Sequence, residues 1–310
     1  MNILIIGRGV ISTQYAWTFK ENGNNIDFYI RPESKDKYTP MLSLQLEDRR
    51  RKRQLEKVNV SWETNLRYEI PENHDYDLIL VSINIEQIGS IVAALNNKVN
   101  KATVLFFNNF WEDPAKQTEH LPQSQLIYGF PGAGGGTAGT NVINGGFSSS
   151  IMIGDIGTAS KERVQQVYTL FEQANFTVKR QADFKKFLMN HFLLNVAIEI
   201  EVLKEGSFIR LMDSIHGLGN ISINLRQLKP IMRNRGMKFD ATNTLLSMLS
   251  PKMLGIIMSK LIFKNGSTAR VLMEGNNTIT GRSAKLILDE ARRKNIHINT
   301  LENISNLLPS

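Results

Sequence analysis

Residues 1–19, MNILIIGRGVISTQYAWTF, decide the fold of this 310-residue chain. Residues 2–6 form a short apolar run, which predicts a strand buried on both faces of a parallel sheet. Gly7, Gly9 and Ser12 follow at the spacing of a dinucleotide-binding turn, with serine in place of the third glycine. Apolar side chains then recur at every fourth position, which predicts a helix whose N-terminal N–H groups would face phosphates. The stretch therefore predicts a dinucleotide-binding strand, turn and helix, with an ordinary βα turn as the alternative.

The composition is that of an ordinary globular protein, with 42% apolar and 21% charged residues. There is no cysteine, which excludes disulfides, thiolate nucleophiles and cysteine zinc sites, and no metal site is expected. The longest apolar stretch outside the N-terminus, 253–263, contains Lys260 and is too short to cross a bilayer. We expect a cytoplasmic protein without a membrane partner.

The chain carries a net charge of +8, and its basic residues are most concentrated in the run RRRKR at 49–53. Nucleic-acid binding would favour aromatic residues between the cations, and this run has none. We interpret it as the solvated edge of a hairpin and expect no nucleic-acid partner. The basic balance also suits an anionic cofactor and substrate.

Buried strand patterns recur along the first half of the chain, at 26–30, 77–83, 102–107 and 125–128, with helical patterns between several of them. This alternation predicts a doubly wound parallel sheet that binds ligands at the carboxyl ends of its strands. Residues 39–70 alternate polar and apolar side chains instead, which predicts short antiparallel strands.

Residues 129–136, GFPGAGGG, predict a glycine-rich loop. Its glycines would either let the backbone approach a ligand closely or simply make the loop flexible. A hairpin is expected next, with its turn at 144–146 and its second arm at 150–153. From residue 183 onward the pattern is helical, with a break or kink at Pro230. The sequence therefore predicts an α/β fold in which an N-terminal Rossmann-type doubly wound sheet, 1–180, precedes an all-helical domain, 181–310.

Polar residues that could bind a ligand follow two of the predicted strands. Arg31 follows the second strand, where an acidic residue would bind the ribose of NAD and an arginine accommodates the 2′-phosphate of NADP. The alternative is a solvated loop arginine. Asn108 and Asn109 follow the strand 102–107.

The helix that begins at residue 184 is apolar almost all round, but Lys186 and Asn190 interrupt it on one face. Buried polar groups need partners, and a ligand site would supply them. One of the two lysines, Lys185 or Lys186, could instead extend to solvent from the start of the helix. His191 and Asn195 are expected on other faces.

Several segments together resemble the ketopantoate reductases, which are NADPH-dependent enzymes with a Rossmann domain followed by a helical domain. The resemblance is carried by GRGVIS (7–12), LILVSINIEQ (78–87), FFNNF (106–110), FKKFLMNHFLLN (184–195) and the C-terminal segment 281–308. It implies a small 2-oxo acid as substrate, a place in pantothenate biosynthesis, and a helical domain that supports a homodimer.

The resemblance also implies roles for individual residues. Lys186 takes the place of the catalytic lysine, and Glu274 is the candidate for the family's carboxylate. Substrate contacts are implied for Asn109, Asn190, Asn195 and Ser267. Cofactor contacts are implied for Gly7, Arg8, Gly9, Val10, Ile11, Ser12, Arg31, Asn84, Gln87, Asn108 and Asn109.

Several departures from the family pattern are visible. Asn84 stands where the family usually has a lysine, Phe110 replaces a glycine, Asn195 is one position late with no proline after it, and Glu274 is one residue out of register. The family's serine segment has no clear counterpart, and Ser267 is a loose candidate for it. The cofactor and its hydride chemistry are therefore better supported than ketopantoate as the substrate. The alternatives are a reductase of another small carbonyl compound and a catalytically inactive NADP(H)-binding sensor.

Overall fold

The computed structural model describes residues 1–50, 56–154, 156–276 and 280–309. The chain forms two compact units, Met1–Lys185 and Lys186–Ser310. This division lies close to residue 180, after which the sequence contains almost no strand patterns. Within the described ranges, no helix has the length and apolar character needed to span a membrane.

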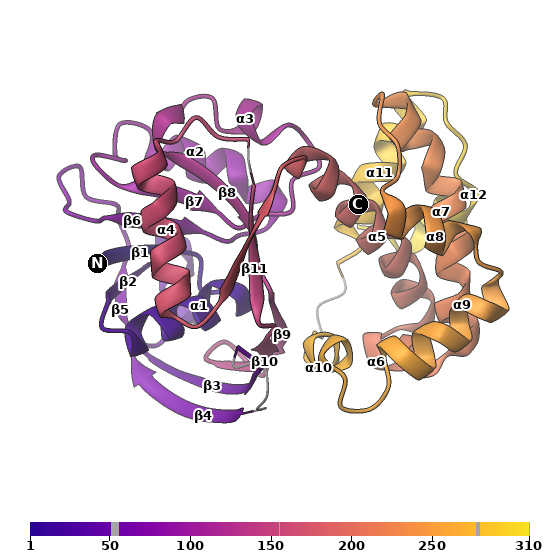
Figure 1. The fold of residues 1–310 in the computed structure, drawn as a ribbon, viewed down its shortest axis with the longest axis horizontal. Helices are drawn as coiled ribbons and strands as arrows, with labels where there is room; N and C mark the ends of the chain where they lie inside the picture. The colour runs from indigo at the N-terminus through magenta and orange to yellow at the C-terminus, as the bar shows by residue number, and fades with distance from the viewer. Residues whose placement is uncertain (51–55, 155, 277–279, 310) are drawn as a thin grey trace. The chain divides into compact units, whose positions relative to one another are not determined.

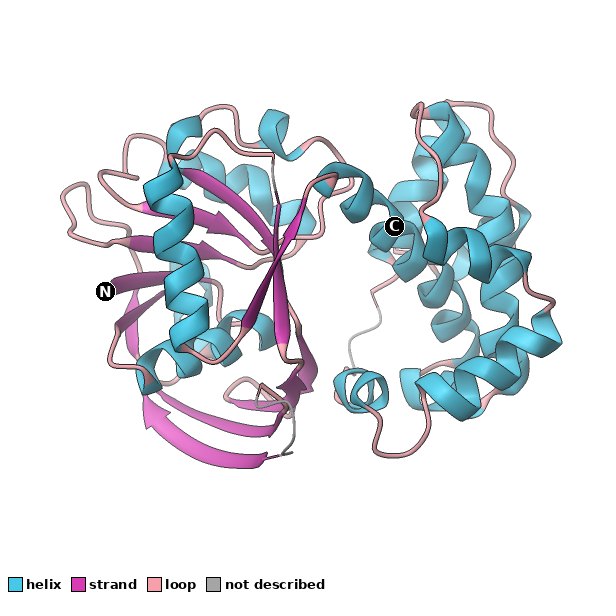
Figure 2. Cartoon of the chain, in the orientation of Figure 1, coloured by secondary structure: helices cyan, strands magenta, loops and turns pink. Residues whose placement is uncertain are grey.

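An eight-stranded sheet forms the centre of the first unit, in the order β12-β11-β8-β7-β6-β1-β2-β5 (Figure 2). The strands are β1 (Asn2–Ile6), β2 (Asn25–Tyr29), β5 (Asn65–Arg67), β6 (Leu78–Val81), β7 (Thr103–Phe106), β8 (Leu126–Phe130), β11 (Ser150–Gly154) and β12 (Thr177–Gln181). The six adjacent strands β5, β2, β1, β6, β7 and β8 run parallel to one another, and β11 pairs with β8 in the antiparallel direction. Their order is that of the dinucleotide-binding fold, which confirms the predicted doubly wound sheet. The order reverses between β1 and β6, so a ligand crevice is expected at the carboxyl ends of these two strands.

Helices and aromatic side chains cover both faces of this sheet. The helices are α1 (Val10–Glu21), α2 (Ile88–Leu95), α3 (Pro114–Gln117) and α4 (Lys161–Gln173), labelled in Figure 1. Phe107 packs on Tyr15 of α1 and Phe171 of α4, with ring centroids 5.2 and 5.5 Å away. Its neighbour Phe106 packs on Tyr128 instead, because successive strand residues point to opposite faces. The fully buried strands thus read as continuous apolar runs in the sequence.

A second, four-stranded sheet has the order β4-β3-β10-β9. Its strands are β3 (Met41–Asp48), β4 (Glu56–Glu63), β9 (Ala133–Thr137) and β10 (Val142–Phe147). The antiparallel pair of β3 and β4 confirms the prediction for part of 39–70. The predicted glycine-rich loop and the predicted turn at 144–146 were wrong, because most of these glycines lie in the paired strands β9 and β10. The predicted second arm, β11, belongs to the large sheet.

The glycines of β9 and β10 permit close packing rather than approach to a ligand. A Cβ atom on Gly135 would lie 2.1 Å from the carbonyl oxygen of Asn144, and one on Gly145 would lie 2.1 Å from that of Gly134. The Gln14 side chain of α1 donates to the same Gly134 oxygen at 2.9 Å. The small sheet therefore supports the helix that follows the dinucleotide-binding turn.

Arg50 corrects the interpretation of the basic run as a solvated edge. Its guanidinium is only 10% exposed and forms an ion pair with Asp48 at 2.5 Å. It also lies 5.3 Å from the ring centroids of Trp17 and Phe147, so cation–π contacts compensate for its burial. Residues 51–53 of the run lie outside the described residues.

The second unit is entirely helical in its described residues, as predicted. Its elements are α5 (Phe184–Glu205), which begins at the end of the first unit, α6 (Phe208–Asp213), α7 (Ile215–Asn234), α8 (Ala241–Met248), α9 (Pro251–Ile257), the π-helical turn η4 (Met258–Ile262), α10 (Thr268–Glu274), α11 (Arg282–Arg293), α12 (Asn299–Glu302) and the 3₁₀ turn η5 (Ser305–Leu307).

The predicted break at Pro230 was wrong, because α7 continues through it. Proline has no N–H, so it cannot donate to the backbone carbonyl four residues earlier in the helix. Pro230 is exposed, and solvent can therefore replace the missing hydrogen bond. The chain turns instead at Gly236, whose φ of +70° is accessible to glycine. Met237 N–H donates to the Met232 carbonyl at 3.0 Å and closes the end of the helix.

Candidate functional site

The turn between β1 and α1 requires its first glycine. Gly7 has a φ of +95°, and a Cβ atom there would lie 2.9 Å from the carbonyl oxygen of Ser82, just beyond β6. Gly9 has a different role, because a Cβ on it would meet only the Oγ of Ser12, at 3.9 Å. One glycine thus shapes the turn against β6, and the other leaves open space beside the start of α1.

The N-terminus of α1 has the properties of an anion-binding site. The residue that begins it, Gly9, supplies no side-chain cap, and the first turn contains no acidic residue. The first intrahelical bond runs from Thr13 N–H to the Gly9 carbonyl, so the preceding N–H groups have no partner within the helix. Ser12 is fully buried and donates to the same carbonyl at 3.2 Å, which explains the need for a small residue. The helix dipole adds positive potential at this point.

Arg8, between the two glycines, points into the protein rather than to a ligand. It is 5% exposed and donates to the carbonyls of Thr39 at 2.6 Å and Met41 at 3.2 Å, and to the Asn141 side chain. Burial lowers the pKa of Arg8. Its side chain therefore fixes the turn to β3, and only its backbone remains for a cofactor contact. No sequence pattern predicts this clamp, since its acceptors are mainly backbone carbonyls.

The carboxyl ends of β6 and β7 carry four of the predicted cofactor residues. Asn84 and Gln87 form a reciprocal capping box at the turn after β6, in which Asn84 N–H donates to Gln87 Oε1 at 3.1 Å. Asn108 donates to the Ile83 carbonyl at 2.6 Å, which ties the end of β7 to that of β6. The Oδ1 atoms of Asn108 and Asn109 are buried without a hydrogen-bond partner among the described residues. Buried oxygens of this kind need a donor, and a bound ligand would supply one.

Arg31 lies directly after β2, as predicted, and its side chain is 44% exposed. It forms an ion pair with Glu33 at 3.3 Å. A pair this exposed contributes little to stability, so the guanidinium can exchange it for another anion at small cost. Lys35 lies nearby in sequence, 5.1 Å from the ring centroid of Tyr68.

Lys185, the first of the two lysines at the start of α5, forms an ion pair within the first unit. Lys185 Nζ donates to Asp113 Oδ2 at 2.8 Å, and this contact lowers the pKa of Asp113. The other Asp113 oxygen accepts from Ala115 N–H and caps α3. Lys185 therefore anchors α5 to the segment that follows Asn109. Lys186 is half-buried on the next position of the helix.

Asn190 shares a helix face with Lys186, but the structure gives it a role in the fold. It is 1% exposed and donates to the Lys186 carbonyl at 2.9 Å. Its Oδ1 accepts from Asp240 N–H at 2.9 Å and from Asn243 Nδ2 at 3.2 Å. These bonds hold the start of α8 against α5, and the substrate contact expected of Asn190 stays a prediction.

The other predicted substrate residues lie farther along the second unit. Ser267 caps α10, since its Oγ accepts from Arg270 N–H and donates to the Ile262 carbonyl. Glu274 ends the same helix, forms an ion pair with Arg270 and is 43% exposed. Asn195 is half-buried on α5. Of these three residues, Ser267 already donates its hydroxyl hydrogen to a backbone carbonyl of the second unit.

Two half-buried ionisable groups on α5, His191 and Glu199, were not predicted as site residues. Burial lowers the pKa of His191 to about 4, which the Asp240 carboxylate opposes only in part, so this imidazole is neutral at pH 7. Burial raises the pKa of Glu199, which accepts from Ala284 N–H at 2.8 Å. Glu199 thereby stabilises the start of α11, which has no side-chain cap of its own. Because its partner is a backbone N–H on a distant helix, no sequence pattern indicates this contact.

The strand order, the glycine turn and the uncapped α1 define a Rossmann-type dinucleotide-binding unit that is joined to a helical unit. Sequence comparison identifies the family. The family described as ketopantoate reductase PanE/ApbA matches residues 3–157, half of the chain, and the chain belongs to this family. The family consists of NAD(P)-dependent oxidoreductases that act on CH–OH groups. No curated protein sequence matches the chain.

Several solved structures share the fold over nearly the whole chain. D-mandelate dehydrogenase in a ternary complex with NADH and anilino(oxo)acetate matches with a TM-score of 0.72 and 10% identity, covering 99% of this chain and 97% of that chain. The 2-dehydropantoate 2-reductase of Geobacter metallireducens GS-15 matches with a TM-score of 0.67 and 13% identity, covering 99% of both chains. The dimeric ketopantoate reductase of Staphylococcus aureus matches with a TM-score of 0.59 and 15% identity, covering 99% and 97%. At these identities the likeness establishes the fold.

Proposed function

We propose that the chain is a cytoplasmic NADPH-dependent reductase of a 2-oxo acid, with 2-dehydropantoate as the first candidate substrate and pantoate as its product. The observation that carries the proposal is the uncapped N-terminus of α1 beside Gly7, at the point where the strand order reverses. The fold relative solved with NADH and anilino(oxo)acetate supports 2-oxo acids as the substrate class.

The residues around the turn fit a pyridine dinucleotide. The N–H groups of the first turn of α1 would hold the pyrophosphate, in the space that Gly9 leaves open. The unpartnered Oδ1 atoms of Asn108 and Asn109 would accept from the nicotinamide amide or from the substrate. When bound, NADPH supplies a hydride to the carbonyl carbon. Arg31 would bind the 2′-phosphate in place of Glu33.

The protein's own groups supply the proton and orient the substrate in this proposal. Negative charge develops on the carbonyl oxygen during reduction, and the Lys186 ammonium would stabilise that oxygen and give it a proton. Asn109 would orient the substrate, and Asn195 would bind its polar groups. Glu274 would accept from the substrate hydroxyl after exchanging its contact with Arg270. Because the Lys186 proton goes to the new alcohol, solvent must reprotonate the amine in each turnover.

The direct test is NADPH oxidation by the purified full chain with a panel of 2-oxo acids that includes 2-dehydropantoate. Turnover of 2-dehydropantoate would support the full proposal, and turnover of another member would support a reductase with a different substrate. NADPH binding without any turnover would support the sensor alternative instead.

Two glycine substitutions separate the structural and binding roles of the turn. Gly7→Ala should lower the free energy of unfolding by about 1–2 kcal/mol, because alanine is strained at a φ of +95° and its Cβ contacts Ser82. Gly9→Ala should leave the stability unchanged but weaken NADPH binding, because its Cβ enters the space assigned to the pyrophosphate. Denaturant unfolding and NADPH titration of both variants measure the two effects. Equal NADPH affinity of Gly9→Ala and wild type would contradict the proposed phosphate position.

The second unit has an exposed apolar surface that we propose as a homodimer interface. It consists of Leu245, Met248, Met253, Ile256, Leu261 and Ile262, which are 42–75% exposed. These side chains come from α8, α9 and η4, and α8 and α9 both pack on α7. Large exposed apolar patches mark interaction sites, and a fold relative from Staphylococcus aureus is a dimer.

A double variant tests this interface. Met248→Glu/Leu261→Glu should convert a dimer to a monomer, because each change would bury a charge in an apolar interface. Met41→Glu, at a 52% exposed methionine of β3, should leave the dimer intact. Sedimentation velocity at micromolar concentration measures the outcome. A wild-type monomer, or a double variant that stays dimeric, would contradict the interface.

A further inference from the structure

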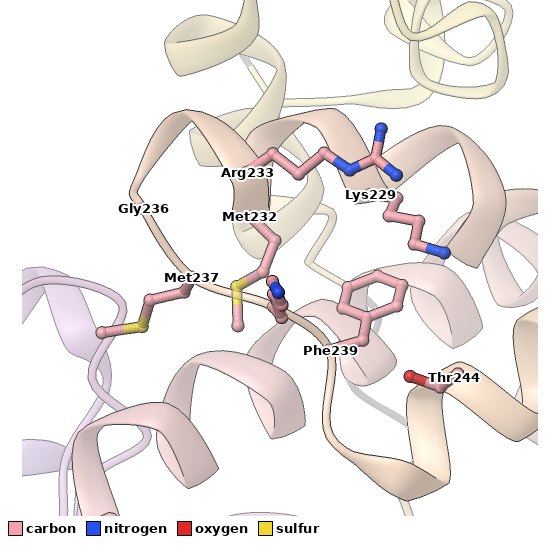
Figure 3. Close-up of a pocket in the computed structure, with 8 residues that line it drawn as sticks. Lys229, Met232, Arg233, Gly236, Met237, Phe239 and Thr244 are labelled. Carbon is pink, nitrogen blue, oxygen red and sulfur yellow. The ribbon is translucent and has the colours of Figure 1, made fainter.

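A pocket of about 500 Å³ lies within the second unit, where α7 ends and the chain turns into α8 (Figure 3). It is lined by Lys229, Met232, Arg233, Gly236, Met237, Lys238, Phe239 and Thr244. None of these residues belongs to the proposed reductase site. The volume is in the range of small-molecule sites.

The lining combines an apolar part with three cations. Phe239 is 7% exposed and lines the pocket with its aromatic ring, and Met232, also among the lining residues, is fully buried. Lys229 and Arg233 lie one helical turn apart on the same face of α7. Lys229 and Phe239 both line the pocket, as Figure 3 shows. An apolar surface bordered by positive charge is suited to an amphipathic anion.

The three cations of the pocket, of which Arg233 and Lys238 are exposed, have no acidic partner, unlike several other cations of this unit. Within the described ranges, Lys229, Arg233 and Lys238 form no ion pair or hydrogen bond through their side chains. By contrast, Lys204, Arg235, Arg270, Lys285 and Arg292 each contact a carboxylate at 2.6–2.9 Å.

The nearest acidic residue in sequence, Asp240, does not neutralise them. Its Oδ1 accepts from Asn243 N–H at 2.8 Å and caps α8. The negative end of the α7 dipole explains a cation in the last turn, such as Arg233. It explains neither Lys229, which lies more than a turn before the end of α7, nor Lys238, which lies beyond it. The pocket therefore holds uncompensated positive charge next to buried apolar groups.

We propose that this pocket binds a small organic acid with an apolar body. Lys229, Arg233 and Lys238 would hold the anionic group, and the Phe239 ring would contact the apolar part. The site goes beyond the proposed reductase function and does not depend on it. The expected ligand has one anionic group and a hydrocarbon or aromatic part. It must be small enough to fit a pocket of about 500 Å³.

Displacement of a fluorescent aromatic sulfonate, 1-anilinonaphthalene-8-sulfonate, from the full chain tests the site. The double variant Lys229→Gln/Arg233→Gln should bind this probe about tenfold more weakly than wild type, the scale of one lost charge-assisted contact. In wild type, octanoate should displace the probe at lower concentration than 1-octanol, which has the same chain length without the charge. In the double variant this difference between octanoate and octanol should disappear.

Lys294→Gln provides the matched control, since Lys294 is an exposed cation of the same unit outside the pocket. It should leave the probe affinity and the octanoate preference unchanged. Thermal unfolding of all variants checks that these surface changes preserve the fold. Equal probe affinity in wild type and the double variant, or equal displacement by octanoate and octanol in wild type, would overturn the proposal.

Discussion

Replacing Lys186 with alanine is expected to lower kcat by about 10²–10⁴-fold, the usual contribution of a general acid. NADPH binding should remain close to the wild-type value, because Lys186 acts on the developing alkoxide of the substrate and not on the cofactor. The measurement is steady-state kinetics with the 2-oxo acid that proves active, together with an NADPH titration of the same variant.

Lys185→Ala is the matched control for this prediction. Lys185 lies next to Lys186 in the sequence, but its ammonium is paired with Asp113 at 2.8 Å. The pair is 41% and 31% exposed, so its loss should cost at most about 1 kcal/mol of stability. We expect kcat of Lys185→Ala to stay within a few-fold of wild type. Equal and small losses in the two variants would remove Lys186 from the mechanism.

Replacing Arg31 with alanine is expected to weaken NADPH binding by about 10–100-fold, because a charge-assisted contact to phosphate contributes about 1.5–3 kcal/mol. NADH binding should change little, since NADH has no 2′-phosphate. Calorimetric titration with both nucleotides measures the ratio of the NADPH and NADH affinities directly. The Glu33 carboxylate, 3.3 Å from Arg31, competes with the phosphate, so Glu33→Gln should strengthen NADPH binding modestly. Equal wild-type affinity for NADH and NADPH would contradict the assigned cofactor preference.

The fold of the first unit was largely predictable from local sequence patterns. A strand buried on both faces is apolar over most of its length, and β1, β6 and β7 show this in the sequence, apart from Asn2 and Thr103 at the starts of β1 and β7. The requirement for glycine at residue 7 was also predictable, because the turn needs a positive φ.

Long-range pairing was not predictable in the same way. The segments 134–136 and 144–146 resemble loop and turn sequences, yet they pair with each other because their glycines have no side chains that would prevent close packing. Arg50 reads as part of a solvated basic run, and only the fold brings Trp17 and Phe147 to its guanidinium.

In the candidate site, too, local patterns were predictable and long-range contacts were not. Helical periodicity places Lys186 and Asn190 on one face of α5, which is correct. It cannot show that Asn190 is engaged by Asp240 and Asn243, which lie about 50 residues later in the chain. The clamp formed by Arg8 likewise depends on backbone carbonyls that have no sequence signature.

The central claim is that this chain transfers a hydride from NADPH to the carbonyl carbon of a 2-oxo acid. Incubation of the full chain with 2-dehydropantoate and NADPH dideuterated at C4 of the nicotinamide tests it most directly. Mass spectrometry and proton NMR should find pantoate with one deuterium on C2, and the deuterium should be absent when NADPH bears hydrogen and the solvent is D₂O. Failure to form a C2-deuterated 2-hydroxy acid from 2-dehydropantoate or from any other 2-oxo acid, with NADPH bound, would contradict the account.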